Sequence, residues 1–260
     1  MDRTIELKQN GKDDYRFLET GGDHIHQLFR ENDWKNLIGV SSVVKDITNF
    51  GIAAYYGSRR CLMGLGYDPK DAKNEVGAFK TLISDLSTKD DKDIVKTLYN
   101  AYTAHAKYAK SRAEKGTSSH DIVDKWIKRC IAENNGNILP DDNPVVKKFI
   151  ELTGHLKPRF VASEKHGYNE ELWLGGITDV IVETVEGLEI WDNKDRPAIY
   201  DKDLLQMGGY SLLFPMKFTG VRGIPLEGKE VRGYFDIGKL QNAFKCQLEV
   251  YKFLEAFNQK

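Results

Sequence analysis

Residues 160–210 read FVASEKHGYNEELWLGGITDVIVETVEGLEIWDNKDRPAIYDKDLLQMGGY, and this stretch is expected to decide the fold. Two parts of it, 172–183 (LWLGGITDVIVE) and 188–194 (LEIWDNK), are rich in β-branched and aromatic residues, which predicts two β-strands. The sequence TVEG at 184–187 lies between them and is compatible with a hairpin turn. The sequence therefore predicts a β-hairpin here, although the turn leaves its register open.

The register decides which side chains meet across this hairpin. A two-residue loop at 185–186 would place Asp179 opposite Asp192, whereas a loop at 186–187 would place Asp179 opposite Lys194. In both registers the three side chains share one face, because side chains alternate with a period of two along a strand. Directly opposed residues have Cβ atoms roughly 5 Å apart. Two carboxylates that close repel each other unless a cation or a proton lies between them.

A third carboxylate and an imidazole are expected to join this pair. Glu164 lies in RFVASEK, the strand expected before the hairpin. His120 ends the sequence GTSSH, which is expected to open an amphipathic helix with Thr117 or Ser118 as its N-cap. Apolar residues recur there at helical spacing: Ile122, Val123, Trp126, Ile127, Cys130 and Ile131. Carboxylate oxygens suit magnesium or manganese, and a neutral imidazole also binds metals, so the sequence predicts a divalent-cation site.

Taken together, these residues resemble the PD-(D/E)XK nucleases in their RecB-like branch. Five short motifs carry the resemblance: a helical G-x-x-x-H, a strand Glu, G-x-x-D, (D/E)-x-K and a helical Q-x-x-x-Y. They are matched, in this order, by Gly116 and His120, by Glu164, by Gly176 and Asp179, by Asp192 and Lys194, and by Gln206 and Tyr210. D-x-K alone carries no information, but all five motifs in order between residues 41 and 214 are a specific signal. The family usually has an aromatic or apolar residue before the Lys and Thr or Ser after it, where Asn193 and Asp195 stand here.

The resemblance implies an α/β fold with a mixed central β-sheet flanked by helices, which is a restriction-endonuclease-like core, and an N-terminal helical elaboration. It implies a DNA-cutting nuclease that uses one or two Mg²⁺ or Mn²⁺ ions. The expected role is that of an exonuclease in recombination, repair, or phage and mobile-element DNA processing. A homo-oligomer or a recombination partner protein is compatible with the resemblance, because some relatives close into rings around DNA.

The resemblance also gives each matched residue a role. Asp179 and Asp192 would be the central metal ligands. His120 and Glu164 would complete one or two metal positions, and the carbonyl group of Asn193 would add an oxygen. Lys194 would orient or stabilise the attacking hydroxide, while Gln206 and Tyr210 would hold the DNA or the catalytic strand.

Two other functions remain open at this point. A site-specific endonuclease would need a recognition module, and the usual helical or zinc signatures of such modules are missing from the sequence. A catalytically idle nuclease fold could instead serve as a DNA-binding or assembly subunit. The presence of Asp179, Asp192 and Lys194 favours an active enzyme over that alternative.

Composition excludes several classes of protein. The 260 residues are 40% hydrophobic and 30% charged, and the mean hydropathy is −0.50, which are values of a globular chain. No apolar run approaches the roughly 20 residues needed to span a bilayer, and the N-terminus has no secretory h-region. The three cysteines, Cys61, Cys130 and Cys246, are odd in number and far apart, which predicts reduced thiols. We therefore expect a cytoplasmic protein, of a cell or of a phage-infected host, without the four-cysteine iron–sulfur cluster of some RecB-like nucleases.

The net charge of −1 argues against a protein that coats nucleic acid through bulk charge. Basic residues do cluster locally, and the run from Lys107 to Lys115 leads directly into the His120 motif. Arg112 and Lys115 in this run are the predicted contacts with DNA phosphates. A solvated helix face is the alternative interpretation of such a cluster.

The whole chain, 1–260, is expected to form a single nuclease domain. Its predicted parts are a small β element at 1–40, a helical elaboration at 41–115, a catalytic core at 116–214, and a hairpin with a C-terminal helix at 215–260. In the β element, Asn10-Gly11 predicts a two-residue hairpin. The paired His24 and His26 are interpreted as a strand-edge His-x-His without a ligand role, since no Cys or further His lies near them in sequence.

Several helix boundaries are predicted from capping residues and helix breakers. Ser41 or Ser42 is expected to cap a helix to about Gly66, Asp68-Pro69 a second to about Leu86, and Asp90 or Asp91 a third to Lys115. Asp201 is expected to cap a helix through Phe214. Inside it, two adjacent glycines, 208 and 209, each cost about 1 kcal/mol relative to Ala. Such a cost indicates close packing or the close approach of a ligand, and we take it to favour a functional face.

Overall fold

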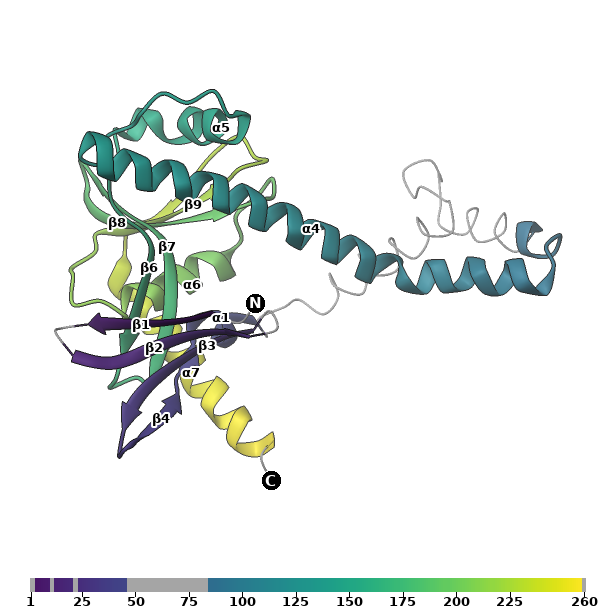
Figure 1. The fold of residues 1–260 in the computed structure, drawn as a ribbon, viewed down its shortest axis with the longest axis horizontal. Coiled ribbons are helices and arrows are strands. Elements are labelled where there is room, and N and C mark those ends of the chain that lie inside the picture. Colours follow the sequence, from purple (N-terminus) through teal and green to yellow (C-terminus); the bar gives the residue numbers. More distant parts are fainter. Residues whose placement is uncertain (1–2, 10–11, 21–22, 46–83, 259–260) are drawn as a thin grey trace. The chain divides into compact units, whose positions relative to one another are not determined.

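The computed structural model describes residues 3–9, 12–20, 23–45 and 84–258 (Figure 1). The chain divides into two units, one formed by Met1–Ile47 with Ser118–Lys260 and the other by Thr48–Thr117. The first unit contains both β-sheets and all predicted site residues except Arg112 and Lys115. Within the described residues, no helix combines the length and the apolar character that crossing a bilayer requires.

The N-terminal sheet has four antiparallel strands in sequence order: β1 (Arg3–Gln9), β2 (Lys12–Thr20), β3 (Asp23–Arg30) and β4 (Asp33–Asn36). Gln9 pairs with Lys12, so the predicted two-residue connection is confirmed, although residues 10–11 lie outside the described part. Tyr15 of this sheet stacks on Tyr168 of the main sheet, with ring centroids 5.2 Å apart. The small sheet is thereby docked on the strand that carries Glu164.

The main sheet contains β5 (Ile38–Gly39), β6 (Arg159–Asn169), β7 (Leu174–Thr184), β8 (Gly187–Lys194), β9 (Gly220–Pro225) and β10 (Arg232–Tyr234). Its strand order is β10-β9-β8-β7-β5, and β6 pairs with β7 as well. The β5–β7 and β8–β9 pairs are parallel and the others antiparallel, so the sheet is mixed. The predicted hairpin is confirmed, and the pairing of Thr184 with Gly187 places its loop at 185–186.

Helices cover both faces of this sheet, which confirms a mixed α/β fold. The described helices are α1 (Val40–Lys45), α4 (Asp91–Asn134), α5 (Pro144–Thr153), the short 3-10 helix η1 (Gly154–Leu156), α6 (Asp201–Ser211) and α7 (Ile237–Asn258). On one face, Ile181 and Ile190 of the sheet join a core with Met207 of α6 and Phe244 of α7. On the other face, residues of α4 and α5 pack with neighbouring strand residues: Trp126, Phe149, Val180 and Trp191. Burial of these large apolar side chains is the main favourable term that holds the layers together.

Several predicted boundaries are wrong. The helix expected to begin at Gly116 is the continuation of α4, which begins at Asp91 and has its first turn capped by the Asp90 carboxylate, 2.9 Å from the amide nitrogen of Asp93. Gly116 is tolerated inside it because one interior glycine costs only about 1 kcal/mol. Helix α1 begins at Val40, so Ser41 and Ser42 lie inside its first turn and do not precede it.

Other boundaries in the C-terminal half also differ. The N-cap of α6 is Tyr200, whose backbone N–H donates to the carboxylate of Asp203, so Asp201 is the first helical residue. Strand β9 extends from Gly220 to Pro225 and pairs antiparallel with β10, so the hairpin predicted within 215–260 is confirmed. The C-terminal helix is confirmed as α7. The helix predicted from Asp68-Pro69 to about Leu86 lies outside the described residues except for its end, where residues 84–86 are helical, and the part of the first predicted helix beyond Lys45 also lies outside them.

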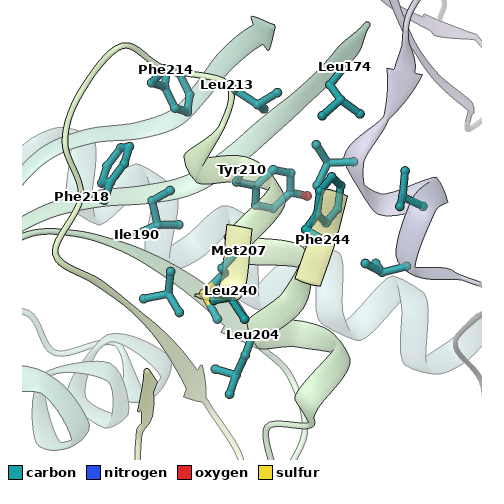
Figure 2. Packing of buried hydrophobic residues seen from close by; sticks show 14 of the residues in the cluster. Leu174, Ile190, Leu204, Met207, Tyr210, Leu213, Phe214, Phe218, Leu240 and Phe244 are labelled. Carbon is teal, nitrogen blue, oxygen red and sulfur yellow. The ribbon is translucent and has the colours of Figure 1, made fainter. Parts of the chain in front are cut away.

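The two glycines of α6 are explained by helix packing. A Cβ atom on Gly209 would lie 2.4 Å from the ring of Phe244, and one on Gly208 would lie 2.7 Å from Cγ of Leu240. Figure 2 shows the side chains of Leu240 and Phe244 against α6 in this core. The close approach of α7 therefore requires both glycines, and the functional-face interpretation is wrong for these two positions.

We expect Gly209→Ala to lower the free energy of unfolding by up to about 2 kcal/mol. Overpacking against the buried Phe244 ring costs about 1–3 kcal/mol, which the roughly 1 kcal/mol gain in helix propensity offsets only in part. Urea unfolding measures the difference. The matched control is Gly238→Ala in α7, where a Cβ would meet no atom closer than 3.9 Å. Equal stability changes in the two variants would contradict this account.

Candidate active site

The predicted site residues gather where β8 separates from β7. Strand β6 pairs with one edge of β7 along nearly its full length, so β5 and β8 must share the opposite edge. On that edge β5 pairs with Leu174 and Gly175, and β8 pairs with residues 180–184. The described strands therefore leave residues 176–179 unpaired there, and Asp179 lies at the end of this split. After Trp191, β8 is no longer paired with β7, but it stays paired with β9 on its other edge.

One hydrogen bond bridges the split. The backbone N–H of Asn193 in β8 donates to Oδ2 of Asp179 in β7 over 2.9 Å. A carboxylate that accepts from a backbone amide is held in a fixed orientation by a charge-assisted bond, which is stronger than a neutral one. Asp179 is thereby kept beside the strand that carries Asp192 and Lys194.

Glu164 in β6 lies directly opposite Asp179 in β7, at the edge of β7 that faces away from β8. Ser163 pairs with Val180 and Lys165 pairs with Thr178, which places Glu164 and Asp179 opposite each other. Glu164 has a φ of 50°, in the left-handed region that costs a non-glycine residue of order 1–3 kcal/mol at such sites.

The side-chain alternation of β7 is interrupted between Leu174 and Ile181. These two residues lie in the same core cluster, although one is an even-numbered and the other an odd-numbered position. Strict alternation therefore does not run through the whole of β7. The backbone strain at Glu164 is of the kind that clusters at functional sites.

His120 reaches this pair from α4. Its Nδ1 atom lies 3.6 Å from Oδ2 of Asp179. One helical turn later, Asp124 accepts a hydrogen bond of 2.7 Å from the hydroxyl of Ser163, the residue that precedes Glu164. Asp124 therefore ties α4 to β6 and fixes where His120 sits. Asp124 was not among the predicted site residues. Its position four residues after His120 places both side chains on the same face of the helix, and this spacing could have indicated it.

Asp192 and Lys194 form a close ion pair. The Nζ atom of Lys194 lies 2.6 Å from Oδ2 of Asp192, whose side chain is only 3% exposed. Burial raises the pKa of Asp192 to about 6; Lys194 opposes this rise, and Asp179 adds to it. Burial lowers the pKa of the Lys194 ammonium, but the Asp192 and Asp179 carboxylates outweigh it and raise that pKa above its usual range. Lys194 is therefore a charged donor at neutral pH.

Glu164 is strongly affected by its surroundings. Burial raises the pKa of its carboxyl group to about 7, and repulsion by Asp179 and then by Asp124 adds to the rise. Three carboxylates, those of Glu164, Asp179 and Asp192, thus share a partly buried region where their negative charges are incompletely compensated. A cation or a proton relieves this repulsion, and oxygen donors of this kind fit a hard divalent ion.

Gln206 and Tyr210 are linked to each other and to β7. Nε2 of Gln206 donates to the hydroxyl oxygen of Tyr210 over 2.7 Å. The ring of Tyr210 packs on Gly176, where a Cβ would lie 3.0 Å from Cε1. Burial is the largest cause of the raised pKa of Tyr210, and the negative charges of Asp192 and Asp179 add to it. The hydroxyl of Tyr210 therefore keeps its proton at neutral pH. The G-x-x-D and Q-x-x-x-Y motifs are therefore in contact.

A cavity of about 900 Å³ opens on these residues. His120, Glu164, Asp179 and Tyr210 line it on one side, whereas β3, β5, α1 and the C-terminal part of α7 complete the lining. Asp192 is buried behind this surface and does not line the cavity. The predicted ligands are thus brought into one region, but only three of them face the same space.

The remaining predicted ligand positions can also be located. Asn193 is buried, and its Oδ1 atom has no hydrogen-bond partner among the described residues. Among those residues, no three His, Cys, Asp or Glu side chains are already arranged to hold a metal ion, which says nothing either way about metal binding.

The side chains of the predicted DNA contacts, Arg112 and Lys115, lie outside the described residues. Cys130 is a buried free thiol and Cys246 an exposed one.

His24 and His26 lie on β3 and pair with β2, whereas β4 pairs only with residues 27–30 of β3, so β4 does not cover the strand edge at the two histidines. His26 is buried, and its Nδ1 atom lies 2.6 Å from the hydroxyl of Tyr15. Burial, together with the nearby His166 and His24, lowers the pKa of His26 to about 4. His26 is therefore a neutral imidazole at neutral pH, and its tautomer decides which of the two groups donates this hydrogen bond.

No protein-family model matches the chain, and no curated protein matches it either. What the site can do therefore follows from its own groups. The carboxylates of Glu164 and Asp179 and the imidazole of His120 line one cavity and can hold a cation, with the Asp192 carboxylate buried behind them. The Lys194 ammonium and the Tyr210 hydroxyl are donors that can bind an anionic group beside it.

Removing a neighbouring negative charge should lower the pKa of Glu164 from about 7. Because repulsion by Asp179 is the larger contribution, Asp179→Asn should lower it more than Asp124→Asn. Carboxyl ¹³C NMR titration of metal-free protein measures both shifts. Asp142→Asn, a change at a fully exposed carboxylate, is the matched control. A pKa that stays near 7 in both site variants would mean that charge crowding is not its cause.

Proposed function

We propose that this chain is a metal-dependent deoxyribonuclease of the PD-(D/E)XK superfamily, in its RecB-like branch, and that it acts as an exonuclease. The observation that carries the proposal is the convergence of His120, Glu164 and Asp179 on one cavity from α4, β6 and β7. The Asp192–Lys194 ion pair lies beside them, across the split between β7 and β8. Separate motifs that are expected together by resemblance are thus neighbours in space.

The architecture supports the same proposal. The β7–β8 hairpin is antiparallel, the following strand β9 is parallel to β8, and helices pack on both faces of the sheet. This is the mixed sheet expected for a restriction-endonuclease-like core. Carboxylates placed at the split of such a sheet lie on rigid strands, which holds them more firmly than loops would.

A divalent ion, Mg²⁺ or Mn²⁺, would be held by Glu164 and Asp179 with His120, and Asp192 is a further carboxylate close enough to Asp179 for its pKa to be raised by it. The fit rests on the donor chemistry: hard oxygens, crowded enough that the pKa of Glu164 is raised to about 7. When bound, such an ion lowers the pKa of a coordinated water and acts as a Lewis acid on the phosphate.

The residues of the chain itself supply position and charge. In the hydrolysis, a water oxygen bonds to phosphorus, the bond from phosphorus to the leaving oxygen breaks, and the leaving oxygen takes up a proton. Lys194, held by Asp192, offers N–H donors to the attacking oxygen and a positive charge to the phosphate. Tyr210, whose hydroxyl is held by Gln206, lines the cavity and would orient the strand.

Lys194→Ala should reduce DNA cutting by at least about 100-fold, because it removes a preorganised donor while leaving the carboxylates in place. Asp179→Ala should abolish both cutting and manganese binding. The assays are gel electrophoresis of end-labelled single- and double-stranded DNA with and without manganese, and calorimetric titration of the metal. The control is Lys217→Ala, a change at an exposed lysine that does not line the site cavity.

The outcomes separate the rival functions. Metal-dependent shortening from an end supports the exonuclease, whereas cuts in circular DNA indicate an endonuclease. Binding without cutting by the unaltered protein indicates an idle subunit. Unchanged manganese affinity in Asp179→Ala refutes the metal assignment.

A further inference from the structure

A second cavity shares a rim with the first. Its volume is about 720 Å³, and four residues line both cavities: His24, Ile25, Ser41 and Ser42. These four belong to β3 and to the first turn of α1, so the N-terminal part of the chain forms the common rim. On its other side the second cavity is lined by residues around the start of α6, among them Arg196, Lys202 and Gln206.

The two cavities differ in charge. The first has the Glu164 and Asp179 carboxylates beside the site. The second is lined by three cationic side chains, Lys194, Arg196 and Lys202, and by a single carboxylate, that of Asp203. Lys194 connects the two, because it lines the second cavity while its ammonium group is paired with Asp192 of the site. The second cavity therefore attracts anions, whereas the first attracts a cation.

The cations of the second cavity are unequally engaged. Arg196 is fixed by an ion pair with the carboxylate of Asp203 and by stacking on the ring of Tyr200, 4.7 Å from its centroid. Lys202 has neither a hydrogen bond nor an ion pair within the part of the chain that the structure describes, and it is half-buried at the cavity wall. Its charge is available to a ligand, and the guanidinium of Arg196 is already oriented beside it.

We propose that the second cavity binds the phosphodiester backbone of one polynucleotide strand, which crosses the shared rim into the first cavity. Lys202 and Arg196 hold phosphates, and the hydroxyls of Ser41 and Ser42 are donors along the rim. Cavities of roughly 300–1,000 Å³ accept groups of small-molecule size, so each has room for part of a single strand. This inference deepens the proposed function. It rests on that function for one point, which is that the strand leads from the second cavity to the nuclease site in the first.

The test is the salt dependence of binding in the absence of metal. Full-length protein is titrated with EDTA present into fluorescein-labelled single-stranded DNA, and anisotropy is followed at several KCl concentrations. Losing one phosphate contact reduces the slope of log K against log[salt] by about 0.7 for a single strand. Lys202→Gln should therefore show that smaller slope and roughly fivefold weaker binding at 0.1 M salt, equally for different sequences. Lys217→Gln is the matched control and should behave like the unaltered protein.

Each outcome bears on the proposal separately from the nuclease assay. If Lys202→Gln and Lys217→Gln have the same slope, the second cavity does not hold the backbone and the inference fails, whether or not the protein cuts DNA. If inorganic phosphate at millimolar concentration displaces the strand from the unaltered protein, the cavity holds a single phosphate group, and the inference fails in another way. A smaller slope for Lys202→Gln without any cutting by the unaltered protein supports the backbone site and refutes the nuclease.

Discussion

Mutual repulsion among the carboxylates of Glu164, Asp179 and Asp192 is the constraint on which the rest of the site depends. Burial is the larger cause of the raised pKa values of Glu164, about 7, and of Asp192, about 6, and repulsion by Asp179 adds to both. The fold compensates part of the charge. Lys194 pairs with Asp192, and the backbone N–H of Asn193 donates to Asp179. What remains uncompensated lies at the wall of a cavity, where a cation can reach it.

The sheet makes this arrangement possible because β8 leaves β7 at the site. A continuous ladder would have placed a paired strand beside residues 176–179, and no cavity would open there. The split is stabilised from outside: β8 continues in parallel pairing with β9, and α6 is held against the sheet by its close contact with α7 at Gly208 and Gly209. Tertiary packing thus maintains an opening that local strand pairing alone would close.

The β7–β8 hairpin, the strand of Glu164 and the helix of Gln206 and Tyr210 were predictable, since each is written in a short local pattern. The register of the hairpin was not predictable, because loops at 185–186 and at 186–187 both suit the sequence TVEG. The observed loop is at 185–186, and it sets Gly187 against Thr219, which is distant in sequence. The interruption of side-chain alternation in β7 was not predictable either, because it shows only in the packing of Leu174 and Ile181 into one core cluster. The contact of Asp124 with β6 and the lining of the second cavity both result from elements that are distant in sequence and lie side by side in the fold. A local sequence pattern does not predict such neighbours.

The account is tested most directly by diffraction from crystals soaked in manganese, with data collected at a wavelength where the anomalous signal of manganese is strong. We expect a peak in the larger cavity in contact with the carboxylates of Glu164 and Asp179, and no peak there in crystals of Asp179→Ala. A well-occupied manganese ion elsewhere on the protein, with none between these two carboxylates, would contradict the account.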